Sequence, residues 1–70
     1  MSVGSQYEIF EAAKVNNLRR VRELLDAGVD VNLVDFDNGS TPLHYACSNG
    51  SKQTMELLIQ RYLVVAYLHH

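Results

Sequence analysis

The sequence predicts an all-α fold, a solenoid fragment of two helix-turn-helix repeats joined by a β-hairpin-like loop. Three observations lead to this prediction. Apolar residues recur at helical spacing in four short segments. Glycine, asparagine, threonine and proline stand at the ends of these segments, where helices are capped. The apolar positions of the first two segments recur in the same order in the other two.

The first helix is predicted to begin near Gln6. The stretch from Ser5 to Glu8 has the S-x-x-E pattern of a capping box, in which both side chains satisfy free backbone amides. Asn16 tolerates the left-handed conformation and is expected to end this helix, after which Asn17 caps the next one. The predicted core positions of these two helices are Ile9, Phe10, Ala12, Ala13, Leu18, Val21, Leu24 and Leu25.

A turn-rich loop is expected between the two helix pairs. Gly28 ends the second helix by supplying a positive φ, and the helical period disappears from Val29 to Ser40. Aspartate, asparagine and glycine gather between Asp35 and Gly39, a composition typical of tight turns. We therefore interpret this segment as a loop with hairpin-like geometry.

The third helix begins with a strong capping signal. Thr41 can cap the helix, and Pro42 fits its first position because the amide that proline lacks would have no helical partner there. Gly50 ends this helix, and Ser51 is expected to cap a fourth one. The predicted buried side of the fourth helix comprises Met55, Leu58, Ile59 and Tyr62.

The core positions of the two helix pairs superpose when the chain is shifted by one repeat, which is 34 residues. The matched positions are Ala12 with Ala46, Ala13 with Cys47, Val21 with Met55, Leu24 with Leu58, and Leu25 with Ile59. Repetition of a helix pair at a period in the thirties is typical of a solenoid, in which each unit buries its apolar face against the next.

The start of the third helix also carries a family signature. Residues 41–46 read T-P-L-H-Y-A, which matches the T-P-L-H-x-A signature of ankyrin repeats. Residues 23–32 look like the end of such a repeat, and residues 35–39 look like the hairpin that leads into the next one. From about Tyr7 to Ile59 the chain resembles the ankyrin-repeat family. The family's usual period is about 33 residues, and the extra residue of this chain falls in the hairpin tip.

This resemblance implies four segments. Residues 1–6 are a leader, residues 7–40 a first, capping repeat with its hairpin, residues 41–61 a second repeat, and residues 62–70 an apolar tail outside the family pattern. The second repeat is unfinished, because Tyr62 stands where Gly28 stands in the first. Since solenoids generally need about three repeats to be stable, a truncated array or a fragment is one open interpretation.

Composition argues against several classes of function. The 70 residues carry a net charge of −2, whereas nucleic-acid binding normally requires a basic surface. The apolar run at 62–68 is far shorter than the ~20 residues that cross a bilayer, so no membrane partner is expected. The single cysteine, Cys47, permits no internal disulfide and favours a cytoplasmic or nuclear protein.

No residue pattern indicates catalysis, a cofactor or a bound metal. His44 and Cys47 lie three residues apart, downstream of Asp35 and Asp37, so a nucleophile and base or a partial metal site can be imagined. In the ankyrin-like arrangement both are structural instead. His44 would hydrogen-bond locally and to a neighbouring repeat, while Cys47 would pack as a small hydrophobic residue. We therefore predict a non-enzymatic protein.

The one basic cluster combines Lys14, Arg19, Arg20 and Arg22. Two interpretations are open for it, a patch that binds an acidic protein surface and an ordinary solvated face. The second is favoured, with Arg19 paired to Glu23 one helical turn away.

The resemblance implies that the chain binds another protein, because ankyrin arrays use hairpin tips and the inner-helix face for recognition. The corresponding partner-binding residues here are Val34, Phe36, Asp37, Asn38, Ser40, Tyr45, Ser48 and Asn49. Phe36 and Tyr45 are the expected anchors, since aromatic rings supply much of the binding energy of small interfaces. The alternative for Phe36 is that it folds over the next repeat.

Two further interpretations of the function remain open, a truncated array with no autonomous binding role and the binding portion of a larger regulatory protein, enzyme or channel. The tail at 62–68 has no charge, proline or glycine. It is expected to extend the fourth helix, bury part of its apolar side against the second repeat and leave some self-association. His69 and His70 are assigned no function.

Overall fold

The two helix pairs predicted from the sequence are present in the computed structural model, which describes residues 5–68. A short 3-10 turn, η1 (Ser5–Tyr7), leads into α1 (Glu8–Lys14), and α2 (Leu18–Asp26) follows it. A loop over residues 27–41 reaches α3 (Pro42–Ser48), which is followed by α4 (Lys52–Leu68). No β-strand forms within residues 5–68, and the predicted all-α fold of two repeats is confirmed.

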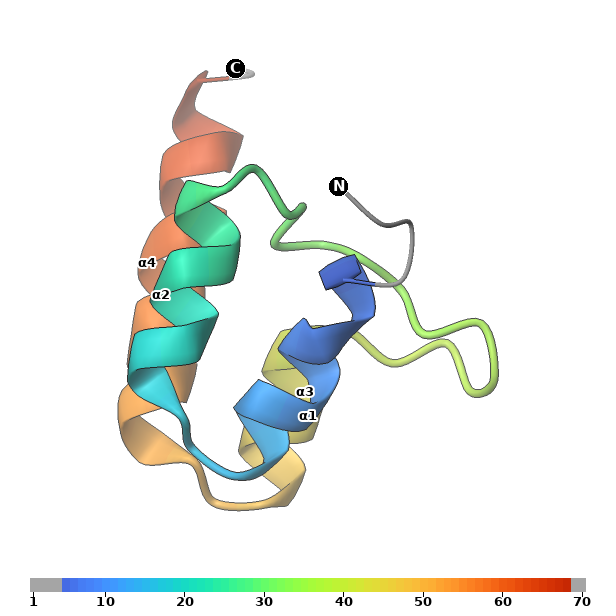
Figure 1. The fold of residues 1–70 in the computed structure, drawn as a ribbon. Coiled ribbons are helices and arrows are strands. Elements are labelled where there is room, and N and C mark those ends of the chain that lie inside the picture. The colour runs from blue at the N-terminus through green and yellow to red at the C-terminus, as the bar shows by residue number, and fades with distance from the viewer. Residues whose placement is uncertain (1–4, 69–70) are drawn as a thin grey trace.

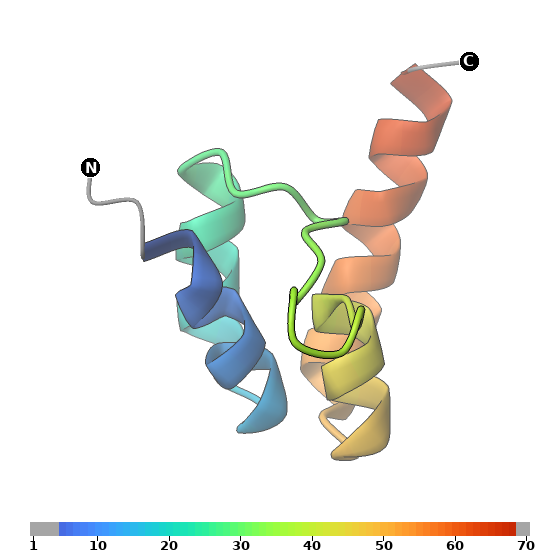
Figure 2. The ribbon, with the colours of Figure 1, turned by 90° about the vertical axis from the view of Figure 1, so that its right-hand side faces the viewer.

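The helices form two layers, one for each repeat. α1 packs against α3 and α2 against α4, and the two helices of each pair also contact one another. Figure 1 shows the tight turns of both pairs at the same end of the molecule, with the long loop projecting beside α1 and α3. The perpendicular view in Figure 2 separates the two pairs. The loop therefore lies beside the shorter helices.

The core lies between and within the two layers. Val21 and Leu58, from the second helix of each pair, are completely buried. Full burial of a side chain such as leucine contributes about 1.5–3 kcal/mol to the free energy of unfolding. The buried apolar residues are Ile9, Phe10, Ala12, Ala13, Val21, Leu24, Leu25, Val31, Ala46, Leu57 and Leu58.

The predicted caps of α2 and α3 are confirmed. Asn17 Oδ1 accepts a hydrogen bond from Arg20 N at 3.2 Å, and Thr41 Oγ1 accepts one from His44 N at 3.3 Å. Gly28, which follows α2, has a φ of 103°. Each of these caps joins residues close in sequence, which is why the pattern alone predicts them.

The first α-helix begins slightly later than predicted, after the 3-10 turn η1. α1 begins at Glu8, and its N-cap residue Tyr7 makes no capping hydrogen bond through its side chain. The Glu8 carboxylate binds Arg20 of α2 at 2.6 Å. The side chain of Ser5, the other member of the predicted capping box, lies outside the described side chains, so the capping box stays a prediction.

The prediction that the Ser51 side chain caps α4 is wrong. Its hydroxyl donates to the carbonyl oxygen of Lys14 in the first repeat, at 3.1 Å. Asn16, which has the left-handed φ of 57° expected of it, provides the cap instead. Its Oδ1 accepts from Thr54 N at 3.2 Å and from Thr54 Oγ1 at 2.9 Å. A residue of the first repeat thus caps a helix of the second.

The buried side of α4 is also rotated from the predicted one. Ile59 and Tyr62, which were predicted to be buried, are 40% and 47% exposed, and Met55 is only partly buried. The buried residues of α4 are Thr54, Leu57 and Leu58. The superposition of Ile59 on Leu25 assumes a further helix beyond α4, and no element within residues 5–68 occupies that position.

The predicted extension of α4 into the tail is present, but its partly buried side faces the end of the first repeat and not the second repeat as predicted. The helix continues to Leu68, and Val65 lines a hollow of about 500 Å³ together with Arg61 and the residues after α2. The remaining large apolar residues at 62–68 are 47–79% exposed. None of the helices within residues 5–68 has the length and hydrophobicity to cross a membrane. His69 and His70, and most of the predicted leader, lie outside the described residues.

Candidate protein-binding surface

The loop tip, residues 35–40, is closed by hydrogen bonds between its two ends. Asp35 N donates to Ser40 O at 2.8 Å, and Gly39 N donates to Asp35 O at 2.7 Å. Gly39 has a φ of 74°, a conformation that glycine adopts without strain. No strand pairing flanks this tip anywhere in the described part of the chain, so its predicted β-hairpin-like character is not confirmed.

Short polar side chains fix the path of the tip from within. Asp35 Oδ1 accepts from Asp37 N at 2.9 Å, and Asn38 Oδ1 accepts from Ser40 N at 2.9 Å. Both bonds connect a side-chain oxygen with the backbone two residues further on, the pattern of an Asx turn. The polar composition of the loop, which predicted turns, therefore acts through local hydrogen bonds.

Tyr45 of α3 holds the loop tip against the helices. Its hydroxyl donates to Asp35 Oδ2 at 2.6 Å and accepts from Asn38 Nδ2 at 2.8 Å. Its ring lies 5.5 Å from that of Phe10, and Lys14 Nζ lies 4.7 Å from its centroid. Tyr45 is half-buried. The predicted anchor is therefore engaged within the protein, where it positions the loop.

The bond between Asp35 and Tyr45 changes the acidity of both groups. The hydrogen bond donated by Tyr45, with a further one from the Asp37 amide, lowers the pKa of the Asp35 carboxyl from its ordinary value of 3.8. The same bond to Asp35 raises the pKa of the Tyr45 hydroxyl from its ordinary value of 10.0. At neutral pH the protonated tyrosine hydroxyl therefore donates a hydrogen bond to an ionised carboxylate.

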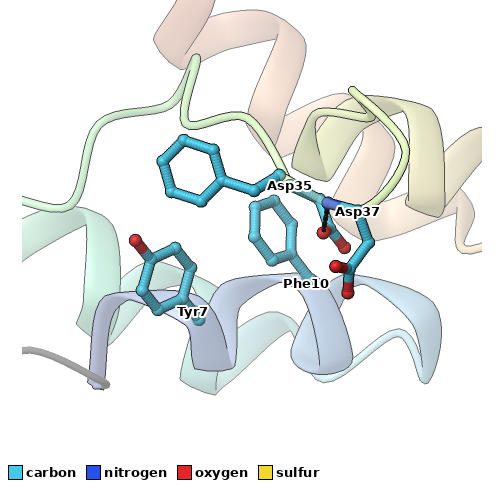
Figure 3. A pocket seen from close by; sticks show the side chains of 5 residues that line it. Tyr7, Phe10, Asp35 and Asp37 are labelled. Atoms are coloured by element: carbon cyan, nitrogen blue, oxygen red, sulfur yellow. Dashed lines mark hydrogen bonds between the residues drawn. The ribbon is translucent and has the colours of Figure 1, made fainter.

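An open groove of about 300 Å³ lies between the loop tip and the start of the first repeat. Its lining residues are Tyr7, Phe10, Asp35, Phe36 and Asp37. In Figure 3, the rings of Tyr7 and Phe10 lie on one side and the carboxylates of Asp35 and Asp37 on the other. The groove thus combines an aromatic wall with an acidic rim. We call it the aromatic groove.

Phe36 is the most exposed aromatic side chain of this surface, with 85% of its area accessible. Its ring lies 6.3 Å from that of Tyr7, at an angle of 58°. Phe36 therefore does not fold over the second repeat, the alternative considered from the sequence, because the ring beside it, that of Tyr7, belongs to the first repeat.

The other predicted contact residues are spread over two regions. Val34, Asp37 and Asn38 are exposed at the loop, and Ser40 is half-buried beside them. Ser48 and Asn49 are exposed at the opposite end of α3. The helix separates them from the tip by about 10 Å, given the rise of 1.5 Å per residue. The predicted loop residues therefore lie together at the tip, whereas Ser48 and Asn49 lie apart from them.

Tyr7 and Phe10 were not predicted to be part of this surface. Phe10 was predicted as core, and its ring does pack against Tyr45, but it also lines the aromatic groove. Tyr7 and Phe10 are three residues apart, and their rings stack at 6.2 Å. Two aromatic residues at this spacing on the inner helix of the first repeat were the available signal.

Among the described residues, no hydrogen bond joins the side chains of His44 and Cys47. Both are exposed, which contradicts the prediction that Cys47 packs like the alanine it replaces. Cys47 Sγ instead lies 3.2 Å from Met55 Sδ on the uncovered side of the second repeat. Within residues 5–68 no three histidine, cysteine or acidic side chains are grouped closely enough to hold a metal.

The basic cluster is divided among separate ion pairs. Arg20 binds Glu8 through two nitrogens and also lies 3.7 Å from Glu23. The hydrogen bond to Glu8 is the main cause of a raised pKa for Arg20. Glu23 therefore pairs with Arg20 rather than with Arg19 as predicted, because these two residues are three apart on α2. The charges are largely those of a solvated face.

The repeated fold and its signature agree with comparisons to known proteins. Residues 9–59 match the family model described as ankyrin repeats in many copies. The chain belongs to the ankyrin-repeat family. Ankyrin repeats generally mediate binding between proteins and are generally non-enzymatic. No solved structure matches the chain significantly.

Several longer proteins are similar to this chain over part of their length. The chain is 40% identical over 55 residues to ankyrin repeat domain-containing protein 40 of Mus musculus, and the matched segment covers 79% of the chain and 15% of that protein. It is 48% identical over 50 residues to osteoclast-stimulating factor 1 of Rattus norvegicus, covering 71% and 23%. A similarity of 34% identity over 73 residues to serine/threonine-protein kinase 12 of Arabidopsis thaliana covers 86% and 16%. The chain thus spans less than a quarter of each of these three relatives.

Proposed function

We propose that this ankyrin chain is a non-enzymatic module that binds another protein through its loop tip and the exposed side of α3. The observation that carries the proposal is the aromatic groove, where the 85% exposed ring of Phe36 stands beside Tyr7 and two carboxylates. An exposed aromatic ring next to a preformed hollow is a typical anchor of a small interface. The tip is also held in place before binding, since Tyr45 joins it to α3.

The chemistry of the groove favours a basic side chain with an apolar stem. Aromatic rings can contact the methylene groups of lysine or arginine and attract the cation through their faces. The carboxylate of Asp37 lies at the rim, where it can pair with the charged end. A partner segment that combines lysine or arginine with apolar neighbours therefore fits this surface. We propose that the protein acts in the cytoplasm or nucleus.

The test is selection of ligands from a random peptide display library on the immobilised chain. We expect enriched peptides to carry arginine or lysine among apolar residues, and their affinity to fall as salt screens the acidic rim. Phe36→Ala should weaken binding at least about tenfold, as expected for an anchor that contributes about 1.4 kcal/mol or more. Asp37→Asn should selectively lower the affinity for peptides that carry the basic residue.

Tyr67→Ala is the matched control, because Tyr67 is 79% exposed and lies at the far end of α4. It should leave peptide affinity unchanged. The proposed surface is wrong if the selected peptides bind Phe36→Ala as tightly as the original chain while circular dichroism shows both folded.

A second candidate is supported by the length of the relatives. Because the matched segment forms less than a quarter of each of them, the chain's surface can equally serve as the binding portion of a larger protein. In that arrangement the aromatic groove would position the rest of the protein on its partner. Fusing the chain to an unrelated reporter enzyme should then recruit that enzyme to a surface coated with the selected peptide, and Phe36→Ala should abolish recruitment.

A further inference from the structure

We propose that two copies of this chain associate symmetrically through the uncovered side of the second repeat, with α4 of one copy antiparallel to α4 of the other. The first repeat shows that this side is built for packing. Its buried residues Phe10, Ala13, Val21 and Leu25 are at most 8% exposed. The shift by one repeat places them on His44, Cys47, Met55 and Ile59, of which only Met55 is partly buried.

The uncovered side continues along α4 as an apolar strip. Residues separated by three, four or seven positions lie on the same face of a helix. The members of this α4 strip are Met55, Ile59, Tyr62, Leu63 and Ala66. The large side chains Ile59, Tyr62 and Leu63 are 40%, 47% and 58% exposed. Figure 2 shows the last turns of α4 rising beyond the other helices. Exposure of an uncharged strip of this kind to water is unfavourable, so covering it lowers the free energy.

The chain up to Leu68 does not fold back over this strip. α2 ends at Asp26, and the equivalent position one repeat later is Gln60, whereas α4 continues to Leu68. Gly28 turns the backbone after α2, but its counterpart Tyr62 remains helical. The further helical residues, from 61 to 68, carry the chain about 12 Å along the same axis. Within the described residues the strip therefore stays open to another molecule.

The first repeat of a second copy is a poor cover for the strip. Thr54 and Leu57, which face the first repeat from α4, correspond by the same shift to Arg20 and Glu23. Those two side chains are charged and lie 3.7 Å apart on the outer side of α2. Placing an apolar strip over them would remove both charges from water, which costs more than it gains. Head-to-tail stacking of copies is therefore disfavoured.

The strip of a second copy is a good cover. In an antiparallel pair with the two-fold axis between positions 62 and 63, Ile59 lies opposite Ala66 of the other copy, and Tyr62 lies opposite Leu63. The contact therefore covers the part of the strip from Ile59 to Ala66. Large residues then face smaller ones, and the two helix dipoles oppose each other favourably. The only charged residue between Leu57 and Leu68 is Arg61, which is bound to Asp26 at 2.7 Å, so no like charges meet.

Sedimentation equilibrium over a range of protein concentrations tests the proposal. Because the pairing surface is short, we expect a weak dimer with a dissociation constant on the order of micromolar. The weight-average mass should rise from one chain to two and stop there. Leu63→Lys should hold it at one chain. Val64→Lys is the matched control, since Val64 is 54% exposed on the same helix but lies outside the strip, and it should behave like the original chain.

A mixing experiment tests the symmetry. Leu63→Lys and Leu63→Glu should each remain single chains, whereas an equimolar mixture should form a dimer because position 63 of each copy lies near position 63 of the other across the axis. Phe36→Ala should dimerise normally, which separates this proposal from the proposed peptide binding. The proposal is overturned if the original chain stays single at every concentration, if it forms larger assemblies, if Val64→Lys also blocks dimerisation, or if the charged mixture does not associate.

Discussion

Asn16 Oδ1 accepts hydrogen bonds from both the backbone nitrogen and the hydroxyl of Thr54, at 3.2 Å and 2.9 Å. These two residues belong to different repeats and are 38 positions apart. Thr54 is completely buried, so its hydroxyl would lack a partner without this contact. The geometry depends on the left-handed backbone of Asn16, which directs its amide group toward α4.

Two substitutions separate the side chain of Asn16 from its backbone conformation. Asn16→Gly keeps a residue suited to a φ of 57° but removes the cap, and should lower the free energy of unfolding by about 1 kcal/mol. Asn16→Ala also adds left-handed strain of about 1–2 kcal/mol and should be the less stable of the two. Urea denaturation followed by circular dichroism measures both. Equal stability of Asn16→Gly and the original chain would show that the cap contributes nothing.

The bond between Asp35 and Tyr45 predicts a pH dependence at both ends of the scale. Because the pKa of Asp35 is lowered in the folded state, its contribution to stability is present above 3.8 and is lost as the pH falls through the folded-state pKa. Because the pKa of Tyr45 is raised, its contribution is present below 10.0 and is lost as the pH rises through its folded-state pKa. Tyr45→Phe should flatten the profile in acid and in alkali.

Thermal unfolding measured across the pH range tests this prediction. Tyr67→Phe serves as the control, since Tyr67 lies on α4, away from the loop network. It should keep the acid and alkaline changes of the original chain. If Tyr45→Phe retains them as well, the hydrogen bond between loop and helix is not their source.

Gly28 should be sensitive to substitution through its backbone alone. It has a φ of 103°, and no atom lies within 4 Å of the place that an added Cβ would occupy. Gly28→Val should therefore lower the free energy of unfolding by at least about 1–2 kcal/mol, although no clash is created. Gly28→Asn should cost less, because asparagine tolerates positive φ better. Chemical denaturation of both variants gives the comparison, and equal losses would argue for a side-chain effect instead.

Leucines from the core and from the α4 strip should respond differently to truncation. Leu24 is 5% exposed, so Leu24→Ala should cost about 2–5 kcal/mol and remove the cooperative transition of so small a domain. Leu63 is 58% exposed, and Leu63→Ala should change stability by no more than about 0.5 kcal/mol. Thermal melts at low concentration, where single chains dominate, make this comparison. Similar losses at both positions would place Leu63 in the core.

Features that depend on neighbouring residues in the sequence were predictable. Asn17 and Thr41 each cap an amide three residues away, and Gly28 acts through its own φ. The cap of α4 was not predictable, because its acceptor comes from Asn16 in the other repeat, while the local candidate Ser51 bonds elsewhere. Sequence spacing carries no information about which side chain reaches across two packed repeats.

The candidate surface follows the same division. The turn-forming residues of the loop were identified correctly, and Phe36 was correctly expected at an exposed position. The role of Tyr45 depends on the path of the loop, which brings Asp35 to its hydroxyl from ten residues away. Ile59 and Cys47 would be buried only if another pair of helices packed against the second repeat. Aligning them with the buried residues of the first repeat assumes that such a pair is present.

The shortness of α3 ties the shape of the loop to the integrity of the whole chain. α3 has seven residues, whereas isolated helices shorter than about 12–15 residues are marginal in water. Its order therefore comes from α1 and α4 on either side, and Tyr45 passes that order on to the tip. The tip should have no melting transition of its own. Amide hydrogens at its closing bonds should exchange only when the entire domain opens, so any loss of global stability would reach the candidate surface in full.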